Sequence, residues 1–241
     1  GVERAVTFKV PESLYSYYSG KERFTSPDYS GYVLHPYDDP YLAVLAREFD
    51  IIQLEEELTD EERLHLMMSF VQSLEYVSDP AEVGQGEYPK YPVETLVDEG
   101  GDCEDTSILM ASILEPMGYN VSLLLMPNHM ALGLAVEASG VNWTVNDVTY
   151  FYVETTNVGW DMGEVPDEFD YETAQVFPVG VAPYVYQSWS ATRRVERLTV
   201  QVKSTNEGRI TAEGYKVWVA LEDRDGFIRA EAQSAAFNLA F

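Results

Sequence analysis

The chain has few residues that could build cross-links or metal sites. Its 241 residues include one cysteine, Cys103, and three histidines. A single cysteine excludes an intrachain disulfide, and this set of side chains is too small for an ordinary structural zinc site. We therefore expect no disulfide framework and no bound metal.

Basic residues are also scarce. Only 15 Lys and Arg stand against 41 Asp and Glu, which gives a formal net charge of -26. Such a charge repels nucleic acids and anionic membrane surfaces at long range, so we expect neither as a partner. Adaptation to high salt, weak binding of divalent cations and attraction to cationic substrates are all compatible with this composition.

Long apolar runs are missing as well. No stretch of about 18 apolar residues occurs, and the opening Gly1-Val2-Glu3-Arg4 is not a signal peptide. We expect no membrane contact by the chain of 241 residues. The leading glycine suggests that a targeting segment lies outside it, and an extracellular or cell-surface ectodomain is one interpretation that leaves localisation open.

The composition that remains is globular, with 46% hydrophobic and 13% aromatic residues. We expect three regions. Residues 1–37 should form an N-terminal strand and a wrap, meaning an ordered segment that covers the core. Residues 38–184 should form a core domain, and residues 185–241 a β-rich extension. The extension resembles part of an immunoglobulin-like sandwich, but it is shorter than the roughly 100 residues of a complete one. It is either truncated or packed on the core domain.

Three helices are predicted in the core domain. Asp38-Asp39-Pro40 favours a helix start, and the apolar spacing that follows predicts a helix ending near Asp50. Thr59-Asp-Glu-Glu62 matches a capping box before a second helix. The segment Cys103–Met117 is apolar nearly all round and is followed by Gly118, which is typical of a buried helix ended by glycine.

Short apolar runs separated by turn residues predict strands after that helix. An antiparallel sheet packed on the Cys103 helix would make an α+β fold. The predicted strands are Val121–Met126, Met130–Val136, Trp143–Val145, Tyr150–Val153, Val195–Val202, Tyr215–Leu221 and Phe227–Ala232.

The segment Asp223-Arg-Asp225-Gly226 resembles a fragment of a calcium-binding loop. It lacks the other oxygen ligands of such a loop, and Asp225-Gly226 is typical of a hairpin turn between strands. Calcium is therefore conceivable but unsupported by the sequence, and no cofactor is expected.

Cys103 stands where a thiol can be activated. It follows Gly100-Gly101-Asp102 at the start of the predicted buried helix. Backbone amides and the helix dipole at this position favour a thiolate and can stabilise an oxyanion. An inert, buried cysteine is the competing interpretation.

Two further residues could complete a catalytic triad. His129 begins a predicted strand that could pair beside the helix, which would let it act as a base. Glu154, at the end of a later strand, is the favoured acid to orient the imidazole, and Asp147 is the alternative. His35 and His65 lack such a context.

Residues near the cysteine could assist. Tyr88 or Tyr91 on the preceding loop could donate a second hydrogen bond to an oxyanion, although packing is the commoner role of such tyrosines. Asp102 and Asp105 are interpreted as capping or dipole partners of the helix.

In combination, Pro92-Val-Glu-Thr-Leu96, Gly100-Gly-Asp-Cys-Glu-Asp105, His129 and Glu154-Thr-Thr156 resemble the transglutaminase-like superfamily, notably its bacterial and archaeal cysteine-peptidase-like members. The resemblance covers residues 60 to 160. It implies a papain-like α+β core in which Cys103 is the nucleophile, His129 the base and Glu154 the acid, and it suggests that Asp105 braces the neighbouring loop. The family's acid is usually an Asp followed by Pro-Thr, whereas Glu154-Thr-Thr stands here.

These patterns predict a cysteine peptidase, amidase or transglutaminase-like acyltransferase that acts on a protein or peptide through a thioester. Hydrolysis is favoured over crosslinking because nothing in the sequence marks a dry amine tunnel. The alternative is a non-catalytic cell-surface binding or scaffold module of the same fold.

Overall fold

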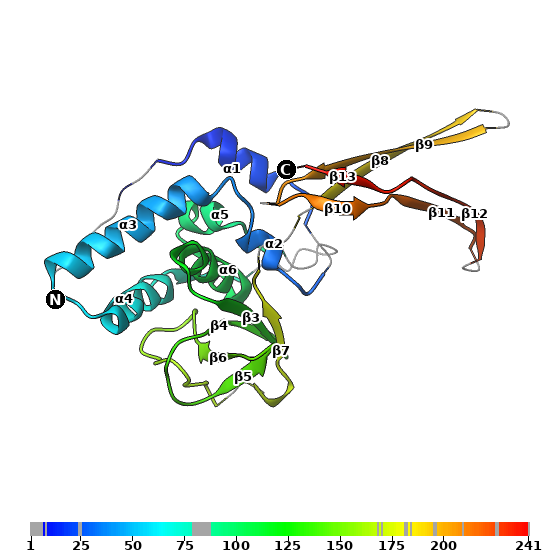
Figure 1. Ribbon diagram of the computed structural model, residues 1–241. Coiled ribbons are helices and arrows are strands. Elements are labelled where there is room, and N and C mark those ends of the chain that lie inside the picture. Colours follow the sequence, from blue (N-terminus) through cyan, green and yellow to red (C-terminus); the bar gives the residue numbers. More distant parts are fainter. Residues whose placement is uncertain are drawn as a thin grey trace. The chain divides into compact units, whose positions relative to one another are not determined.

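The chain forms two compact units, residues 1–180 (unit 1) and 181–241 (unit 2). Unit 1 is a mixture of helices and an antiparallel sheet, and unit 2 is built of strands (Figure 1). The computed structural model describes residues 7, 9–23, 26–78, 88–167, 169, 171–180, 183, 185–194, 197–208, 210–224 and 227–240.

Four helices open unit 1: α1 (Glu12–Ser19), α2 (Ser30–Val33), α3 (Asp39–Glu55) and α4 (Asp60–Gln72). The predicted wrap over residues 1–37 is therefore partly helical. It is held by Tyr18 and Tyr32, which are fully buried and pack against Tyr91. Most of the predicted strand at Val6–Val10 lies outside the described residues.

Of the two helices predicted in this region, α4 begins as predicted and α3 is longer than predicted. The capping box before α4 is confirmed, because Glu62 N donates to Thr59 Oγ1 at 3.2 Å and Thr59 N donates to Glu62 Oε2 at 2.8 Å. Helix α3 runs five residues past the predicted end at Asp50. Ile51 and Ile52 are half-buried there, so packing continues the helix.

Helix α6 (Cys103–Leu114) is the centre of unit 1. It contacts α2, α3, α4 and the short α5 (Pro92–Val97) as well as the sheet (Figure 1). Every residue from Glu104 to Leu114 is buried, which confirms the predicted buried helix. The 3-10 turn Glu115–Met117 follows, and Gly118 ends it with a φ of 89°, a left-handed value that favours glycine.

The strands form a five-stranded antiparallel sheet in the order β5-β6-β4-β3-β7. These strands are β3 (Val121–Met126), β4 (His129–Leu134), β5 (Asn142–Val145), β6 (Val148–Val153) and β7 (Gln175–Pro178). Four of them match predicted strands, and β7 was not predicted. One face of the sheet joins the main core with α6, while Leu124, Ala131 and Tyr152 form a smaller core on the other face.

A short parallel pair leads into α6. Strand β1 (Glu75–Tyr76) pairs with β2 (Gly100–Gly101). A Cβ at Gly101 would lie 2.5 Å from Asp105 Cβ, so only glycine allows the Asp105 side chain to approach here. Gly101 therefore lets the chain pass close to the first turn of α6, while a Cβ at Gly100 would lie 2.5 Å from the Glu75 carbonyl oxygen on β1.

The predicted immunoglobulin-like character of the extension is not confirmed in the described part of unit 2. Its described strands make three separate two-stranded antiparallel pairs, β8–β9, β10–β13 and β11–β12, whereas a sandwich needs two larger packed sheets. The strands are β8 (Val185–Arg194), β9 (Arg197–Asn206), β10 (Ala212–Tyr215), β11 (Trp218–Glu222), β12 (Ile228–Gln233) and β13 (Phe237–Leu239).

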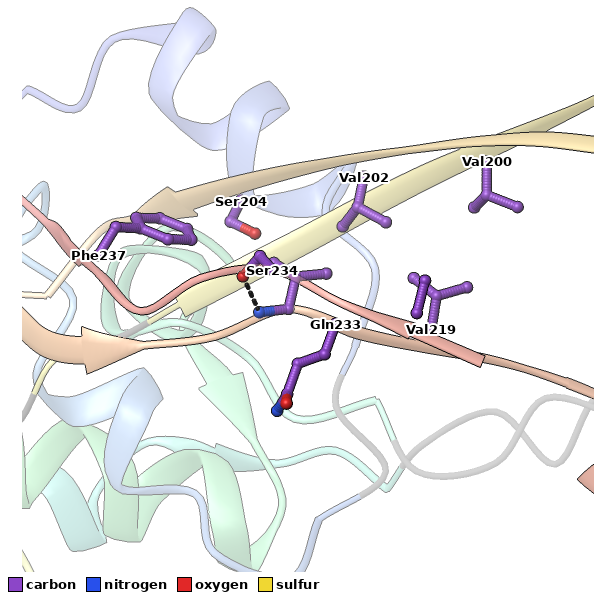
Figure 2. A pocket seen from close by; sticks show the side chains of 9 residues that line it. Val200, Val202, Ser204, Val219, Gln233, Ser234 and Phe237 are labelled. Carbon is purple, nitrogen blue, oxygen red and sulfur yellow. Dashed lines mark hydrogen bonds between the residues drawn. The ribbon is translucent and has the colours of Figure 1, made fainter. Parts of the chain in front are cut away.

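An open groove runs along unit 2. It is lined by apolar side chains of β9, β11 and β12 together with Ser204, Ser234 and Phe237 (Figure 2). The Val217 amide donates to Ser234 Oγ at 3.0 Å beside it. The β11–β12 pairing agrees with a hairpin in which Asp223 accepts from Phe227 N, although Asp225 and Gly226 lie outside the described residues.

Within the described part of the chain, no helix is both long and apolar enough to cross a membrane.

Candidate active site

Cys103 is the first residue of α6 and is half-buried. The turn is held by side chains around it: Asp102 N donates to Asp105 Oδ2 at 3.4 Å, and Thr106 Oγ1 donates to the Asp102 carbonyl at 2.9 Å. Asp105 Oδ1 also accepts from Lys90 N at 2.6 Å, which ties the preceding loop to α6. Asp105 therefore contacts the neighbouring loop, as its predicted bracing role requires.

The thiol lies between a carboxylate and the start of β4. Cys103 Sγ donates to Glu104 Oε2 at 3.2 Å. Burial and the charge of Glu104 raise the pKa of Cys103, while a hydrogen bond from the Met130 backbone amide opposes the rise. The backbone of the residue after His129 thus favours the thiolate. In this arrangement the thiol is neutral, and its described hydrogen bonds do not include one to His129.

His129 is the first residue of β4 and is only 6% exposed. Its Nε2 lies 3.1 Å from Glu154 Oε2. The ring of Phe169 stacks on the imidazole with centroids 3.7 Å apart and planes 3° from parallel. These contacts fix the ring and occupy Nε2. Among the described hydrogen bonds none involves Nδ1, which is the ring nitrogen left for a second partner.

Glu154 is a fully buried carboxylate held on both oxygens. Oε2 accepts from the Tyr152 hydroxyl at 2.5 Å, and Oε1 accepts from Thr155 N at 3.0 Å, Thr156 N at 2.8 Å and Thr156 Oγ1 at 2.6 Å. Burial alone would raise the pKa of Glu154, but the hydrogen bond and charge of His129, with Thr156 and Tyr152, lower it to about 2. The side chain is therefore ionised at neutral pH.

A cluster of hydroxyls joins the three elements that carry these residues. Thr155 Oγ1 lies 3.0 Å from both Thr106 Oγ1 and Ser107 Oγ, and Ser107 Oγ donates to the Met130 carbonyl at 3.3 Å. Gln72 Nε2 donates to the Glu154 carbonyl at 2.9 Å. The end of β6 is thereby bound to α4, to the first turns of α6 and to the start of β4.

Asp147, the alternative acid, lies at the other end of β6. It is exposed in the tight turn between β5 and β6, with a φ of 64°. A six-residue strand spans about 20 Å, so a side chain at its start cannot meet a histidine bonded to the residue after its end. The structure brings Glu154, and not Asp147, to His129.

The two tyrosines suggested as oxyanion donors have other surroundings. Tyr91 is fully buried, and its ring stacks on Tyr18 with centroids 4.2 Å apart. The Tyr88 hydroxyl donates to Glu94 Oε1 at 3.1 Å. The described hydrogen bonds of Cys103 include neither tyrosine, so an oxyanion role for either stays a prediction.

Two contacts of the site were not predicted from the sequence. Phe169 comes from a loop 40 positions after His129 with no motif around it, so no sequence signal marked its stacking. Tyr152 did carry a signal, because it stands two positions before Glu154, and alternate residues of an extended segment point to the same face.

Among the described residues, no group of three or more His, Cys, Asp or Glu side chains is arranged to hold a metal ion. Asp223, from the possible calcium fragment, instead pairs with Arg229 and accepts from Phe227 N at 3.0 Å.

No protein-family model and no curated protein sequence matches the chain. Similar solved structures include Legionella pneumophila LapG, at 16% identity and a TM-score of 0.39, over 69% of this chain and 86% of LapG. Two further structures, described as calcium-bound and EGTA-treated LapG, have identities of 16% and 18% and TM-scores of 0.34 and 0.35. They cover 55% and 70% of this chain, and 87% and 78% of theirs. A likeness of this extent carries no argument about activity.

Proposed function

We propose that the chain is a thiol-dependent acyltransferase of transglutaminase-like, papain-like fold that acts on amide bonds of a protein or peptide. The observation that carries the proposal is the buried pair of His129 and Glu154. His129 begins β4, and the backbone of the next residue, Met130, acts to lower the pKa of Cys103. A histidine oriented by a carboxylate beside a thiol at a helix start is the arrangement that nucleophilic catalysis requires.

In the proposed reaction, His129 Nδ1 takes the proton from Cys103 as the sulfur attacks the carbonyl carbon of the substrate. The tetrahedral intermediate collapses, its C–N bond breaks, and the imidazolium gives the proton to the leaving amine. A thioester on Cys103 remains. His129 then deprotonates a water or an amine, which attacks the thioester and releases the acyl group, so that the thiol is restored.

The electrostatics of Glu154 support these steps. Because the pKa of Glu154 is lowered to about 2, it is charged whenever His129 becomes an imidazolium, and it stabilises that cation. Its hydrogen bonds from Tyr152 and Thr156 hold the longer glutamate arm in place. We favour water over an amine as the acceptor, and we expect no nucleic acid partner for so acidic a chain.

The test is the rate of Cys103 alkylation by iodoacetamide between pH 5 and 10, on the wild type, His129→Ala and Glu154→Gln. His65→Ala is the control, because this histidine is 36% exposed and pairs with Asp161 instead. We expect the wild-type rate at pH 7 to fall in both active-site variants and to stay unchanged in the control. Parallel runs with added calcium and with EGTA measure any effect of calcium.

The second candidate is a non-catalytic binding or scaffold module of the same fold. It is favoured by the Cys103–Glu104 hydrogen bond, since a thiol engaged with a carboxylate is neutral. Slow alkylation that is indifferent to His129 would support this candidate and contradict the enzyme.

A further inference from the structure

Glu104 is a third acidic group at the site, with no role in the triad. It is the second residue of α6 and is 6% exposed, so its charge lies within the protein. Its Oε2 accepts the hydrogen bond of Cys103 Sγ at 3.2 Å. It is therefore in contact with the atom that would attack the substrate.

A carboxylate in this position opposes formation of the nucleophile. It stabilises the neutral thiol by accepting its hydrogen, and it repels the thiolate in surroundings where burial weakens solvent screening. His129 has the reverse effect, because an imidazole accepts the proton and then pairs with the sulfur anion. Glu104 Oε2 accepts the thiol hydrogen in this structure, and His129 Nδ1 is the acceptor that the proposed reaction requires.

The other groups around the sulfur do not cancel the effect of the Glu104 carboxylate. On α6 and its cap, the negative charge of Asp102 adds to that of Glu104, while Asp105 is directed to Lys90 N. From β4, the Met130 amide donates to the sulfur and His129 stands next in the chain. Among these groups, Glu104 is the one whose side chain accepts the hydrogen bond of the thiol.

We propose that Glu104 is a latch that holds Cys103 as a neutral thiol, and that the thiol becomes nucleophilic when this hydrogen bond is exchanged for one to His129. The latch rests on the proposed function of the site. While it is closed, the S–H bond stays intact. When it opens, that bond breaks, the proton moves to His129 Nδ1, and the carboxylate of Glu104 keeps its charge.

The test compares Glu104→Gln with Glu61→Gln, which lies exposed in the first turn of α4. Glutamine keeps the shape and an acceptor oxygen but removes the charge. We expect Glu104→Gln to be alkylated by iodoacetamide about tenfold faster at pH 7, because a fall of one unit in thiol pKa raises the thiolate fraction about tenfold. The Glu61→Gln variant should match the wild type. All measurements are made in EGTA, and thermal unfolding checks that each variant is folded.

A double variant, Glu104→Gln with His129→Ala, separates the latch from the proposed function. Loss of the acceleration in the double variant supports exchange with His129. Its persistence would show that Glu104 acts on the sulfur by its charge alone, without exchange with His129, and would overturn the latch. An unchanged rate in Glu104→Gln also overturns the latch, while a wild-type rate that still depends on His129 leaves the proposed function standing. If Glu104→Gln does not fold, Glu104→Asp tests the same hydrogen bond with a smaller change, and it should also accelerate alkylation.

Discussion

The two units of this chain differ in how they are built. Unit 1 contains all described hydrophobic core residues except Ala212, whereas unit 2 exposes Trp189, Trp218 and Phe227 by more than half of their surface. By the sequence, residues 1–180 carry 34 acidic and 7 basic side chains, and residues 181–241 carry 7 and 8. The acidity and the candidate active site therefore belong to a well-packed unit, and the strand pairs of unit 2 share neither feature.

The largest expected effect concerns independent folding. A chain that ends at Gly180 should unfold cooperatively and keep the wild-type rate of Cys103 alkylation, because both cores lie within it. A peptide of residues 181–241 should show no cooperative transition, since isolated two-stranded pairs are marginal in water. Circular dichroism during urea titration measures both. A sharp transition in the peptide would break the comparison.

The next effect concerns ion pairs. Arg23 donates to both oxygens of Glu94 at 2.8 and 2.9 Å, and both side chains are nearly buried. Removing one partner with Glu94→Gln leaves a buried charge, so the free energy of unfolding should fall by about 3 to 5 kcal/mol. In unit 2, Asp223→Asn breaks the exposed pair with Arg229 and should change it by about 0 to 1 kcal/mol. Urea denaturation measures both variants, and a similar fall in the free energy of unfolding in the two would contradict this difference between the units.

Two leucines, one in each unit, test whether side-chain packing stabilises unit 1 more than unit 2. Leu109 on α6 is fully buried, and Leu221 on β11 is 50% exposed. Leu109→Ala should destabilise the protein by about 2 to 5 kcal/mol because it leaves a cavity, and Leu221→Ala by about 0.5 kcal/mol or less. Thermal and urea unfolding of the two variants measure this difference, and a larger effect at Leu221 would show that unit 2 has a core of its own.

The smallest effect, at most about 1.4 kcal/mol per pH unit, is the pH dependence that buried acids add to unit 1. Burial raises the pKa of Asp38 to about 8 in the folded protein, against about 4 when unfolded. Between these values only the folded state holds the proton, so the free energy of unfolding falls as pH rises from 4 to 8. Asp38→Asn cannot ionise and should flatten this fall in urea titrations at pH 5, 6, 7 and 8. The exposed Glu61→Gln should keep the wild-type slope, and an unchanged slope in Asp38→Asn would refute the assignment.

Sequence patterns predicted the elements of unit 1 where local signals agree. The capping box at Thr59 marked α4, and the apolar run from Cys103 marked a helix buried on all sides. Predictions failed where distant contacts decide, as in α1, whose buried Tyr18 packs against Tyr91. Strand β8 was missed too, because a strand with little burial lacks the apolar alternation that predicts one.

The sequence by itself determined which chemical groups stand at the ends of which elements: a thiol at a helix start, an imidazole at a strand start and a carboxylate at a strand end. Only the tertiary structure decided that His129 meets Glu154 rather than Asp147, that Phe169 stacks on the imidazole, and that Glu104 accepts the hydrogen bond of the thiol. The physical reason is that propensity and periodicity act over a few residues. The direction of a buried side chain depends instead on neighbours that packing brings from far along the chain.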